Sequence, residues 1–358
     1  MYNFIKQRRY ILFILILLLF LTTVVAAEQL KVHYIDVGQG DSILIQAPEN
    51  NDMLIDGGPR GAGDEVISYL QGQGVENLEY LVSTHPHTDH IGGLLTVLDN
   101  IEVKKVIASG KVHTSKTYEK YLTKIDQKDI SFDVGRKGDQ FNIGEVEFII
   151  LHPDNTEYDL NNSSVVILMQ YKKTKFLFTG DIERKVENKI LEGNVNINSH
   201  FLKVGHHGSK TSTSKEFIEE VTPKVVVISA GEDNRYGHPH SSALERLDQF
   251  EVDIYSTVRN GNIVITTDGE SYNIKTEYNS KIKVSEEKSE YNQKDPPENN
   301  NNDNGKGKFV GSINSDKYHR SGCRWAENIE PENEIWFDTA EEAQKAGYKP
   351  CGTCSPPS

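Results

Sequence analysis

The stretch THPHTDHIGG, residues 84–93, gathers metal-capable side chains just after the largely apolar segment Leu78–Val82. Two imidazoles that lie two residues apart on extended backbone can converge on one metal ion. The two side chains that open a following helix can then face a second ion, as in centres that use two metals for hydrolysis. The side chains concerned are His85, His87, Asp89 and His90.

The N-terminal segment 1–27 has the three parts of a signal peptide. Lys6, Arg8 and Arg9 form a basic beginning, the run Ile11–Leu21 is uninterrupted apolar sequence, and Val24–Ala27 offers small residues for cleavage. We therefore expect a secreted protein, free or associated with the cell surface, that has no stable membrane span after cleavage. An uncleaved N-terminal anchor is the alternative.

The formal net charge of the chain is -14, and removal of the basic N-terminal segment makes it more negative. An acidic surface disfavours broad, nonspecific binding to polyanions. A bound divalent cation reverses the sign locally, so a phosphate-bearing substrate is compatible with this charge.

Residues 28–278 alternate short β-branched runs with amphipathic stretches of helical spacing. Many strands with helices interspersed predict an α+β domain in which helices cover sheets. Leu30–Asp36 and Ser42–Ala47 are expected to pair around the glycine-rich turn 38–41. Further strands are expected at 53–55, 80–83, 103–108, 146–151, 165–169, 176–179 and 225–229, and helices at 63–73, 91–98, 117–128, 184–192, 215–221 and 243–250.

Residues 279–308 lose almost all apolar content and are predicted to form a disordered linker. The remaining residues, 309–358, form a small module that holds all three cysteines of the chain. An odd number of cysteines in an exported protein indicates a free thiol, an intermolecular bridge or a metal site.

The cysteines of this module stand in two close pairs of soft ligands. His319 and Cys323 are separated by three residues, and Cys351 and Cys354 by two. Such pairs suit a closed, tetrahedral structural zinc, whose binding would supply much of the folding free energy of so small a module. A disulfide between Cys351 and Cys354, with Cys323 free, is the alternative in an oxidising compartment.

Motifs on both sides of the histidine stretch resemble those of the metallo-β-lactamase superfamily, in the same order. Asp56 in LIDGG matches an early aspartate that supports the site, Asp181 in FLFTGD matches the aspartate that bridges two metals, and His206–His207 in LKVGHHGSKTS supplies the last histidine ligand. The resemblance covers residues 30 to 278. It implies an αββα sandwich with the metals at one edge, between two sheets.

The phrases IDVGQGDSILI, LFTGDIE, LKVGHHGSKTSTS and YGHPH resemble one branch of that superfamily, the extracellular hydrolase domain of competence-type DNA uptake channels. The ions implied by the resemblance are two divalent metals, zinc or manganese. The implied ligands are His85 and His87 for one ion, Asp89, His90 and His207 for the other, and Asp181 for both.

Only one of the two adjacent histidines is expected to bind metal, because consecutive side chains on extended backbone point to opposite sides. We favour His207, which leaves His206 and His238 as catalytic groups that contact a phosphoryl oxygen. The opposite assignment of His206 and His207 stays open. Asp89 is expected to assist proton movement as well, since it is the only carboxylate in the histidine stretch.

One feature of the superfamily is absent, namely a further histidine ahead of the bridging aspartate. The interval 159–162 contains Asn161 and Asn162 but no histidine, and the nearest one, His152, is expected to end a strand. The ion on His85 and His87 would then be held more weakly, or completed by water or an asparagine oxygen, and Asn162 is expected to support the site. Oxygen-rich coordination shifts the preference from zinc toward manganese.

The C-terminal module resembles the zinc-binding domain of the Ada DNA-repair methyltransferase through the run FDTAEEAQKAGYKPCGTC. In that family the first ligand is the cysteine that accepts a methyl group. Here His319 stands at that position, so the resemblance implies zinc binding without methyl transfer. Acidic residues outnumber basic ones from Phe309 onward, which disfavours contact with a phosphate backbone.

Taken together, these features predict an exported, two-metal hydrolase of phosphodiesters, with DNA as the expected substrate and a nuclease role in DNA uptake. A hydrolase of wall-polymer or small-molecule phosphodiesters keeps the metals and changes the substrate. A non-catalytic surface DNA-binding protein with a degraded metal site is the alternative from another class. No pattern in the sequence sets an oligomeric state.

Overall fold

The computed structural model describes residues 29–278 apart from 156, 233 and 235. It also describes residues 309–356 apart from 313–314, 316, 321–322, 324, 327–328, 330–333, 338 and 347. The chain divides into two compact units, Met1–Asp295 and Pro296–Ser358. The predicted signal peptide, 1–27, and the predicted linker, 279–308, lie outside the described residues.

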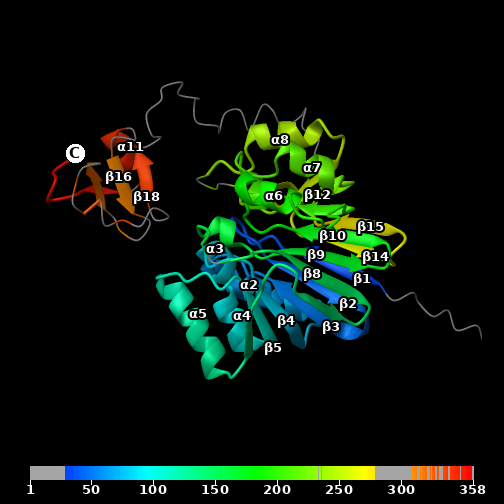
Figure 1. Cartoon of the computed structure of the whole chain (residues 1–358). Helices are drawn as coiled ribbons and strands as arrows, with labels where there is room; N and C mark the ends of the chain where they lie inside the picture. The colour runs from blue at the N-terminus through cyan, green and yellow to red at the C-terminus, as the bar shows by residue number, and fades with distance from the viewer. Residues whose placement is uncertain are drawn as a thin grey trace, which may run out of the picture. The chain divides into compact units, whose positions relative to one another are not determined.

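Two mixed sheets form the first unit (Figure 1). The first sheet contains, in spatial order, β15 (Tyr272–Thr276), β14 (Ile263–Thr267), β1 (Leu30–Tyr34), β2 (Ile43–Ala47), β3 (Asn51–Ile55), β4 (Asn77–Ser83), β5 (Glu102–Ala108) and β6 (Ser131–Val134). The second contains β13 (Asp253–Ser256), β12 (Val225–Ile228), β11 (Phe201–Lys203), β10 (Thr174–Phe178), β9 (Val166–Tyr171), β8 (Val146–His152) and β7 (Gln140–Ile143). The predicted antiparallel pairing of β1 with β2 is confirmed.

Each sheet carries helices on its outer face. The helices packed on the first sheet are α2 (Gly63–Gly72), α4 (Leu94–Asn100) and α5 (Lys116–Gln127). Those packed on the second sheet are α6 (Arg184–Leu191), α7 (Lys215–Val221) and α8 (Ser241–Asp248). Shorter elements are η1 (Pro48–Asn50), η2 (Arg60–Ala62), α3 (Thr88–Ile91), η3 (Asn161–Ser163), η4 (Gly205–Gly208) and α9 (Thr257–Asn260).

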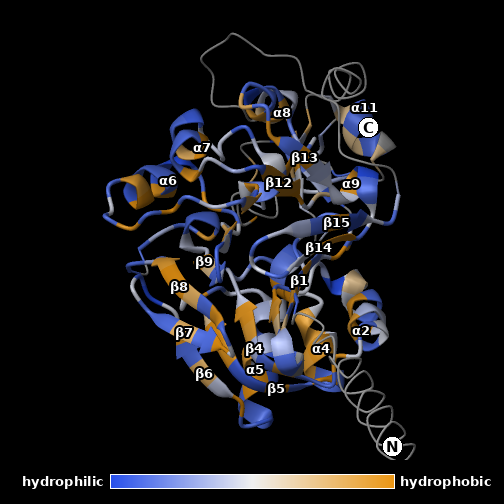
Figure 2. Cartoon of the chain, turned by 90° about the vertical axis from the view of Figure 1, so that its right-hand side faces the viewer, coloured by the Kyte–Doolittle hydropathy of each residue, from blue (hydrophilic) through white to orange (hydrophobic). Residues whose placement is uncertain are grey.

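Three buried clusters show how the strands divide their side chains between the layers. On β10, Phe176 and Phe178 point into the core between the sheets, whereas Leu177 packs toward the outer helices. On β2, Ile45 faces the inner core and Leu44 the outer one. Because side chains alternate along a strand, a strand that is apolar on both faces joins the inner cluster on one side and one of the two outer clusters on the other (Figure 2). The predicted αββα sandwich of α+β content is confirmed.

The strands of both sheets bring loops from distant parts of the sequence to one edge. In the first sheet β3, β4 and β5 run parallel, and in the second β10, β11, β12 and β13 do. Residues that follow such strands meet at the carboxyl ends of the sheet, where ligands bind in open α/β sheets. Asp56 follows β3, His85 follows β4, and Asp181 follows β10.

The second unit is a four-stranded sheet in the order β18 (Glu334–Phe337), β16 (Phe309–Ser312), β17 (Lys317–Arg320) and β19 (Lys349–Pro350), with the helix α11 (Ala340–Lys345). A reciprocal capping box starts α11, because Thr339 accepts a hydrogen bond from the backbone of Glu342 and the Glu342 side chain accepts one from the backbone of Thr339. Phe309, Tyr318 and Phe337 form a small core.

Within the described residues, the helices are all too short or too polar to cross a bilayer.

Candidate metal centre

The histidine stretch lies where β4 ends and α3 begins. His87 has extended backbone and precedes the first residue of α3, whose single turn carries Asp89 and His90. The side chains of His85 and His90 are buried, and that of Asp89 is about one-third exposed. The predicted arrangement of an extended segment followed by a helix start is confirmed.

Asp181 brings the two halves of the centre together. Its Oδ2 atom lies 3.2 Å from Nε2 of His90, 3.2 Å from Nε2 of His207 and 3.8 Å from Nε2 of His85. One carboxylate oxygen therefore faces imidazoles from both sheets. Nε2 of His85 also lies 2.9 Å from Nδ1 of His87.

The second half of the centre consists of Asp89, His90 and His207, which each place a ligand atom within 4.8 Å of the others. Nε2 of His207 lies 3.6 Å from Oδ2 of Asp89. Two ligand atoms bound to one tetrahedral zinc lie roughly 3.3 Å apart, given zinc–nitrogen distances of about 2.0–2.1 Å. The spacing of these side chains therefore fits a divalent cation.

Buried atoms without partners support that fit. Among the described residues, Nε2 of His207 and Oδ1 of Asp181 are buried and make no hydrogen bond. Buried polar atoms are almost always satisfied, by protein, water or an ion. A divalent cation between these two side chains would supply the missing partner.

Asp56 orients His90 from behind, as the sequence predicts for a supporting aspartate. Oδ2 of Asp56 lies 2.8 Å from Nδ1 of His90, so Nε2 is left to face the centre. The same carboxylate accepts hydrogen bonds from the backbone N–H and the hydroxyl of Thr84, at 2.8 and 2.6 Å. Carboxylates in this position fix the ring of a metal-binding histidine and raise its basicity.

The carboxylates and imidazoles of the centre shift one another's pKa values. Burial opposes ionisation of Asp181, but the adjacent His207 and His90 outweigh it and hold the pKa of this carboxyl well below its usual value. Burial likewise opposes protonation of His90 and His207, yet Asp181 raises the pKa of both imidazoles well above the usual value. Cation binding must release these imidazole protons.

The side chains of His206 and His207 point in different directions, as predicted, but the backbone conformation differs from the predicted one. Their backbone is not extended: His206 and His207 both have left-handed conformations, with φ of 48° and 55°. The His207 ring is buried and enters the centre, where its Nδ1 lies 2.9 Å from the carbonyl oxygen of Ser229. The His206 ring is partly exposed and lies 3.4 Å from Glu183. The premise of extended backbone is therefore wrong, while the geometry favours His207 as ligand.

His238 lies beside His206, with a distance of 5.3 Å between the ring centroids. These two rings are called the rim of the centre. Burial, followed by repulsion from His206, lowers the pKa of His238 to about 3. A neutral imidazole results, and its buried Nδ1 makes no hydrogen bond within the described residues. These two rings are the predicted catalytic histidines, and the structure places them side by side.

The interval without a histidine is occupied by η3. The Asn162 amide accepts a hydrogen bond from the backbone of Glu183 at 3.0 Å and donates to Asp159 at 2.9 Å. Asn162 therefore ties η3 to the start of α6. The hydroxyl of Ser164 reaches the centre instead, 3.2 Å from Nδ1 of His85 and 3.0 Å from the backbone N–H of Asp181. His152 ends β8 as predicted, and its Nε2 contacts the backbone oxygen of Asn162.

Three buried charged residues beside the centre or its loops are absent from the sequence predictions: Asp41, Lys203 and Glu187. Asp41 stands in a glycine-rich turn, and Lys203 ends a strand of only three residues. Lys203 alone carries a signal, since a lysine follows the apolar pair Phe201–Leu202 in a run that is otherwise apolar. Both side chains are buried beneath the centre.

Glu187 anchors the loop that presents His207. This buried carboxylate accepts a hydrogen bond from the backbone N–H of Ser214, at 2.9 Å, and another from that of Thr213. Arg246 donates to the carbonyl oxygens of Thr213 and Ser212, both at 2.8 Å. Thr213 is itself left-handed, with φ of 53°. Left-handed non-glycine residues persist only where their surroundings fix them.

We expect Glu187→Gln to loosen this loop. An amide replaces one of two acceptor oxygens by a donor, which faces a backbone N–H and costs about 1–3 kcal/mol of folding free energy. Manganese affinity should fall with stability, because His207 lies on the same loop. Chemical denaturation and calorimetric titration with Mn²⁺ measure the two effects. The control is Glu219→Gln on α7, a half-exposed residue that pairs with Lys215. Equal behaviour of the two variants would contradict the anchoring role.

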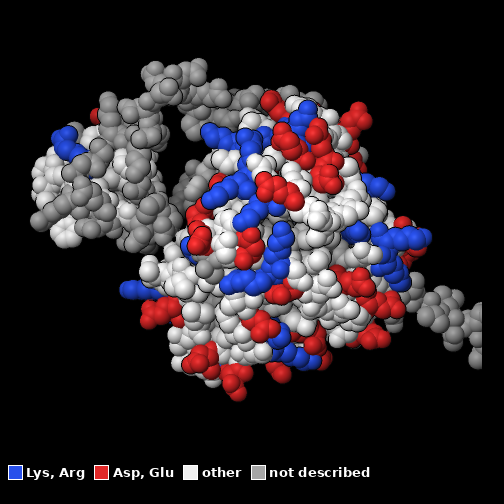
Figure 3. Space-filling view, viewed as in Figure 1, with Lys and Arg blue, Asp and Glu red and all other residues white. Residues whose placement is uncertain are grey.

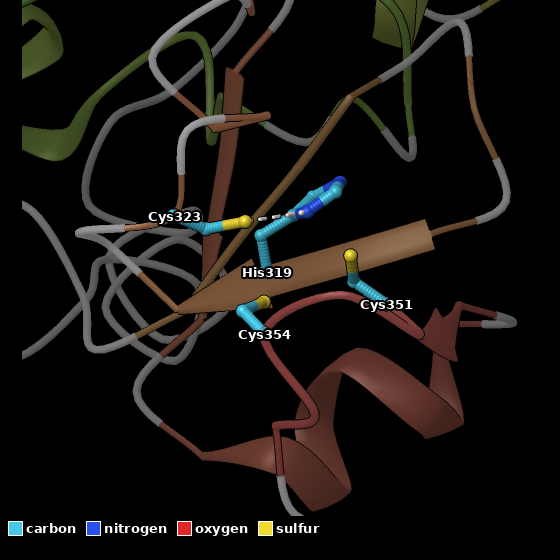
Figure 4. A group of neighbouring side chains, drawn as sticks. All are labelled: His319, Cys323, Cys351 and Cys354. Atoms are coloured by element: carbon cyan, nitrogen blue, oxygen red, sulfur yellow. Dashed lines mark hydrogen bonds between the residues drawn. The ribbon is translucent and has the colours of Figure 1, made fainter.

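The second unit contains a separate cluster of soft ligands (Figure 4). His319, Cys323, Cys351 and Cys354 each offer a ligand atom within 4.8 Å of the others. The three cysteines are free, so the alternative disulfide between Cys351 and Cys354 is not formed. Two backbone N–H groups also point at sulfurs, those of Arg320 at Cys354 and of Thr353 at Cys351, both at 3.4 Å. The cluster suits one tetrahedral zinc.

A centre of histidines and aspartates at one edge between two sheets, flanked by helices, is typical of metal-binding αββα hydrolases. The metallo-β-lactamase superfamily matches residues 35–232, and the chain belongs to this superfamily, whose members are typically metal-dependent hydrolases. The metal binding domain of Ada matches residues 299–357. The predicted combination of the two is confirmed.

Curated relatives of the chain include proteins named for competence and recombination. ComE operon protein 3 of Bacillus subtilis is 36% identical over 265 residues, which is 69% of this chain and 34% of the relative. Recombination protein 2 of Haemophilus influenzae is 33% identical over 65% of this chain and 28% of its own length. Competence protein ComA of Neisseria gonorrhoeae is 29% identical over 63% and 30%. The aligned part of this chain thus spans about a third of each relative.

Proposed function

We propose that this protein hydrolyses phosphodiesters, with DNA as its substrate, at a centre of two divalent cations. The carrying observation is the position of Asp181, whose single Oδ2 atom faces His85 on one side and both His90 and His207 on the other. A carboxylate so placed can bridge two cations. His85 and His87 hold one ion, Asp89, His90 and His207 the other, and Asp181 both.

Bound there, two cations would supply a hydroxide nucleophile near neutral pH and absorb charge on the phosphoryl oxygens. The residues of the chain contribute position and proton transfer. Of the two carboxylates among the ligand candidates, Asp89 has the partly exposed side chain, so it can accept a proton close to the entering substrate. Asp56 and Ser164 hold the rings of His90 and His85 in place.

His206 and His238 form the rim that contacts the phosphoryl group. Oε1 of Glu183 lies 3.4 Å from Nδ1 of His206, and this neighbouring imidazole lowers the pKa of Glu183. The His206 ring stands beside this carboxylate and can contact a non-bridging oxygen. Neutral His238 can donate through one ring nitrogen and accept through the other.

Two observations favour DNA within the class of phosphodiesters. The relatives carry names that refer to competence and recombination. The predicted signal peptide would also place the protein outside the cell, where DNA is taken up. Basic and acidic side chains are interspersed on the face seen in Figure 3, so the cations of the centre would provide much of the attraction for phosphate.

A substrate panel tests this proposal. The full chain, loaded with Mn²⁺ or Zn²⁺, is offered single- and double-stranded DNA, a chromogenic phosphodiester, a wall-polymer phosphodiester and a chromogenic β-lactam. We expect cleavage of DNA and of the chromogenic phosphodiester, and none of the β-lactam. The matched control is His238→Asn, which should reduce turnover and leave metal content unchanged, because His238 belongs to the rim.

Two other outcomes would indicate a different function for this protein. Cleavage of the wall polymer but not of DNA would show that the protein hydrolyses phosphodiesters but that its substrate is a wall polymer. DNA binding without cleavage by fully loaded protein would contradict the hydrolase proposal and favour a surface DNA-binding protein.

A further inference from the structure

Lys203 is the only buried lysine or arginine among the described residues. It ends β11, where Phe201 faces the core between the sheets and Leu202 the outer core. Alternation along the strand therefore directs Lys203 into the space between the two sheets, beneath the metal centre. Burial of an ammonium group is costly unless the charge is paired and hydrogen-bonded.

The partner of Lys203 comes from the opposite sheet. Nζ of Lys203 lies 2.5 Å from Oδ2 of Asp41, in the loop between β1 and β2. It also donates to the carbonyl oxygen of Gly180 at 3.1 Å and lies 3.8 Å from Oδ1 of Asp181. The ammonium group thus contacts the residue that precedes the bridging aspartate and the aspartate itself.

Asp41 in turn lies behind both imidazoles of the second half of the centre. Its Oδ1 is 3.5 Å from Nδ1 of His207, and its Oδ2 is 3.8 Å from Nδ1 of His90. With Asp56 and Asp181, it makes three buried carboxylates around these two rings. Lys203 also belongs to this group of buried charged side chains, and it is the positively charged member that is not a candidate metal ligand.

We propose that Lys203 is an internal cation of the metal centre. It holds Asp41 and Asp181 in place when metal is absent, and its charge weakens the attraction of the centre for divalent cations. Lys203 is a positioning residue, since it contacts Asp181 and not the substrate. The inference rests on the metal centre proposed above but on no particular substrate.

The proposal predicts opposite effects of one substitution. Lys203→Met removes the positive charge and leaves Asp41 buried without its partner. The hydrolase unit, which is the first unit of the chain (Met1–Asp295), should therefore melt roughly 10 °C below the wild-type temperature when it is metal-free. The same change makes the centre more negative, so its dissociation constant for Mn²⁺ should fall by about tenfold or more. A purely structural lysine would not tighten cation binding when removed.

The experiment compares four forms of the full chain: wild type, Lys203→Met, Lys203→Arg and the pair Lys203→Met with Asp41→Asn. Melting is followed by calorimetry after dialysis against chelator, and Mn²⁺ binding by isothermal titration. Manganese is the probe because the thiolate-rich C-terminal cluster prefers zinc. The matched control is Lys104→Met, which breaks a surface pair of the same 2.5 Å length with Glu79.

We expect Lys203→Arg to stay close to wild type in Mn²⁺ affinity, because the charge is kept. The pair of substitutions removes both charges, so it should recover most of the lost stability and return the Mn²⁺ affinity toward that of wild type. If Lys203→Met folds only when Mn²⁺ is present, the proposal is supported as well. Lys104→Met should change neither quantity appreciably.

Unchanged or weaker Mn²⁺ binding by Lys203→Met would overturn the proposal, as would a paired variant no more stable than the single one. Wild type that binds no Mn²⁺ or Zn²⁺ outside the C-terminal cluster would instead refute the metal centre itself. The failure of the two ideas is therefore distinguishable.

Discussion

We expect the replacement of Asp181 by alanine to remove both proposed cations of the hydrolase unit and nearly all phosphodiester hydrolysis. The expected loss in rate is roughly a thousandfold or more, because a ligand shared by two ions supports both the nucleophile and the charge on the phosphoryl oxygens. The geometric reason is the single Oδ2 atom that faces imidazoles from both sheets. Metal content by mass spectrometry and turnover of a chromogenic phosphodiester are measured on the same sample.

Two further variants provide rates with which that of Asp181→Ala can be compared. Asp89→Ala removes one ligand and a proton acceptor, so its rate should also fall by several orders of magnitude. Asn162→Ala should cost far less, since the Asn162 amide contacts Asp159 and Glu183 rather than a histidine of the centre. Full activity of Asp181→Ala would show that the two-metal assignment is wrong.

We expect the removal of zinc to unfold the C-terminal module while the hydrolase unit stays folded. Structural zinc contributes on the order of 10 kcal/mol in small domains, more than a core as small as that of Phe309, Tyr318 and Phe337 can replace. The two tryptophans of the chain, Trp325 and Trp336, both lie in this module, and Trp336 packs against the cluster that includes Cys323 and Cys351. Tryptophan fluorescence of the full chain therefore reports on the module alone.

We expect chelator to shift this emission to longer wavelength and zinc to restore it. Cys351→Ser should show the shifted emission without chelator. Asp181→Ala serves as the control, because its tryptophan response to chelator should equal that of wild type. An emission spectrum that is the same with and without chelator would contradict a zinc-dependent module.

The parts of the fold that the sequence predicts well are those with strong local patterns. The helix predicted at 215–221 matches α7, because Ser214 accepts a hydrogen bond from the backbone of Phe217 and one apolar face packs on the core. The histidine stretch falls at a strand-to-helix junction, as its residue types require. The strand β6, by contrast, is not among the predicted strands: its four residues, SFDV, alternate polar and apolar side chains, but the strand is exposed along its whole length.

The parts that escape prediction depend on contacts between distant segments. Pairing of Lys203 with Asp41 requires the two sheets to face each other, and nothing near either residue specifies that partner. The left-handed backbone of His206 and His207 is likewise imposed by the surrounding loop, since histidine has no intrinsic preference strong enough to fix it. The sequence therefore predicts the candidate ligands but not the buried lysine that the fold places beside them.

Hydrolysis by this protein is proposed to depend on two cations bound at the edge between the sheets. Titration of metal-free full-length protein with Mn²⁺, after the C-terminal cluster is filled with zinc, tests it most directly when bound metal and phosphodiester turnover are followed together. We predict no turnover without Mn²⁺ and full turnover only when two ions per hydrolase unit are bound. Turnover by metal-free protein, or none by protein carrying both ions, would contradict the claim.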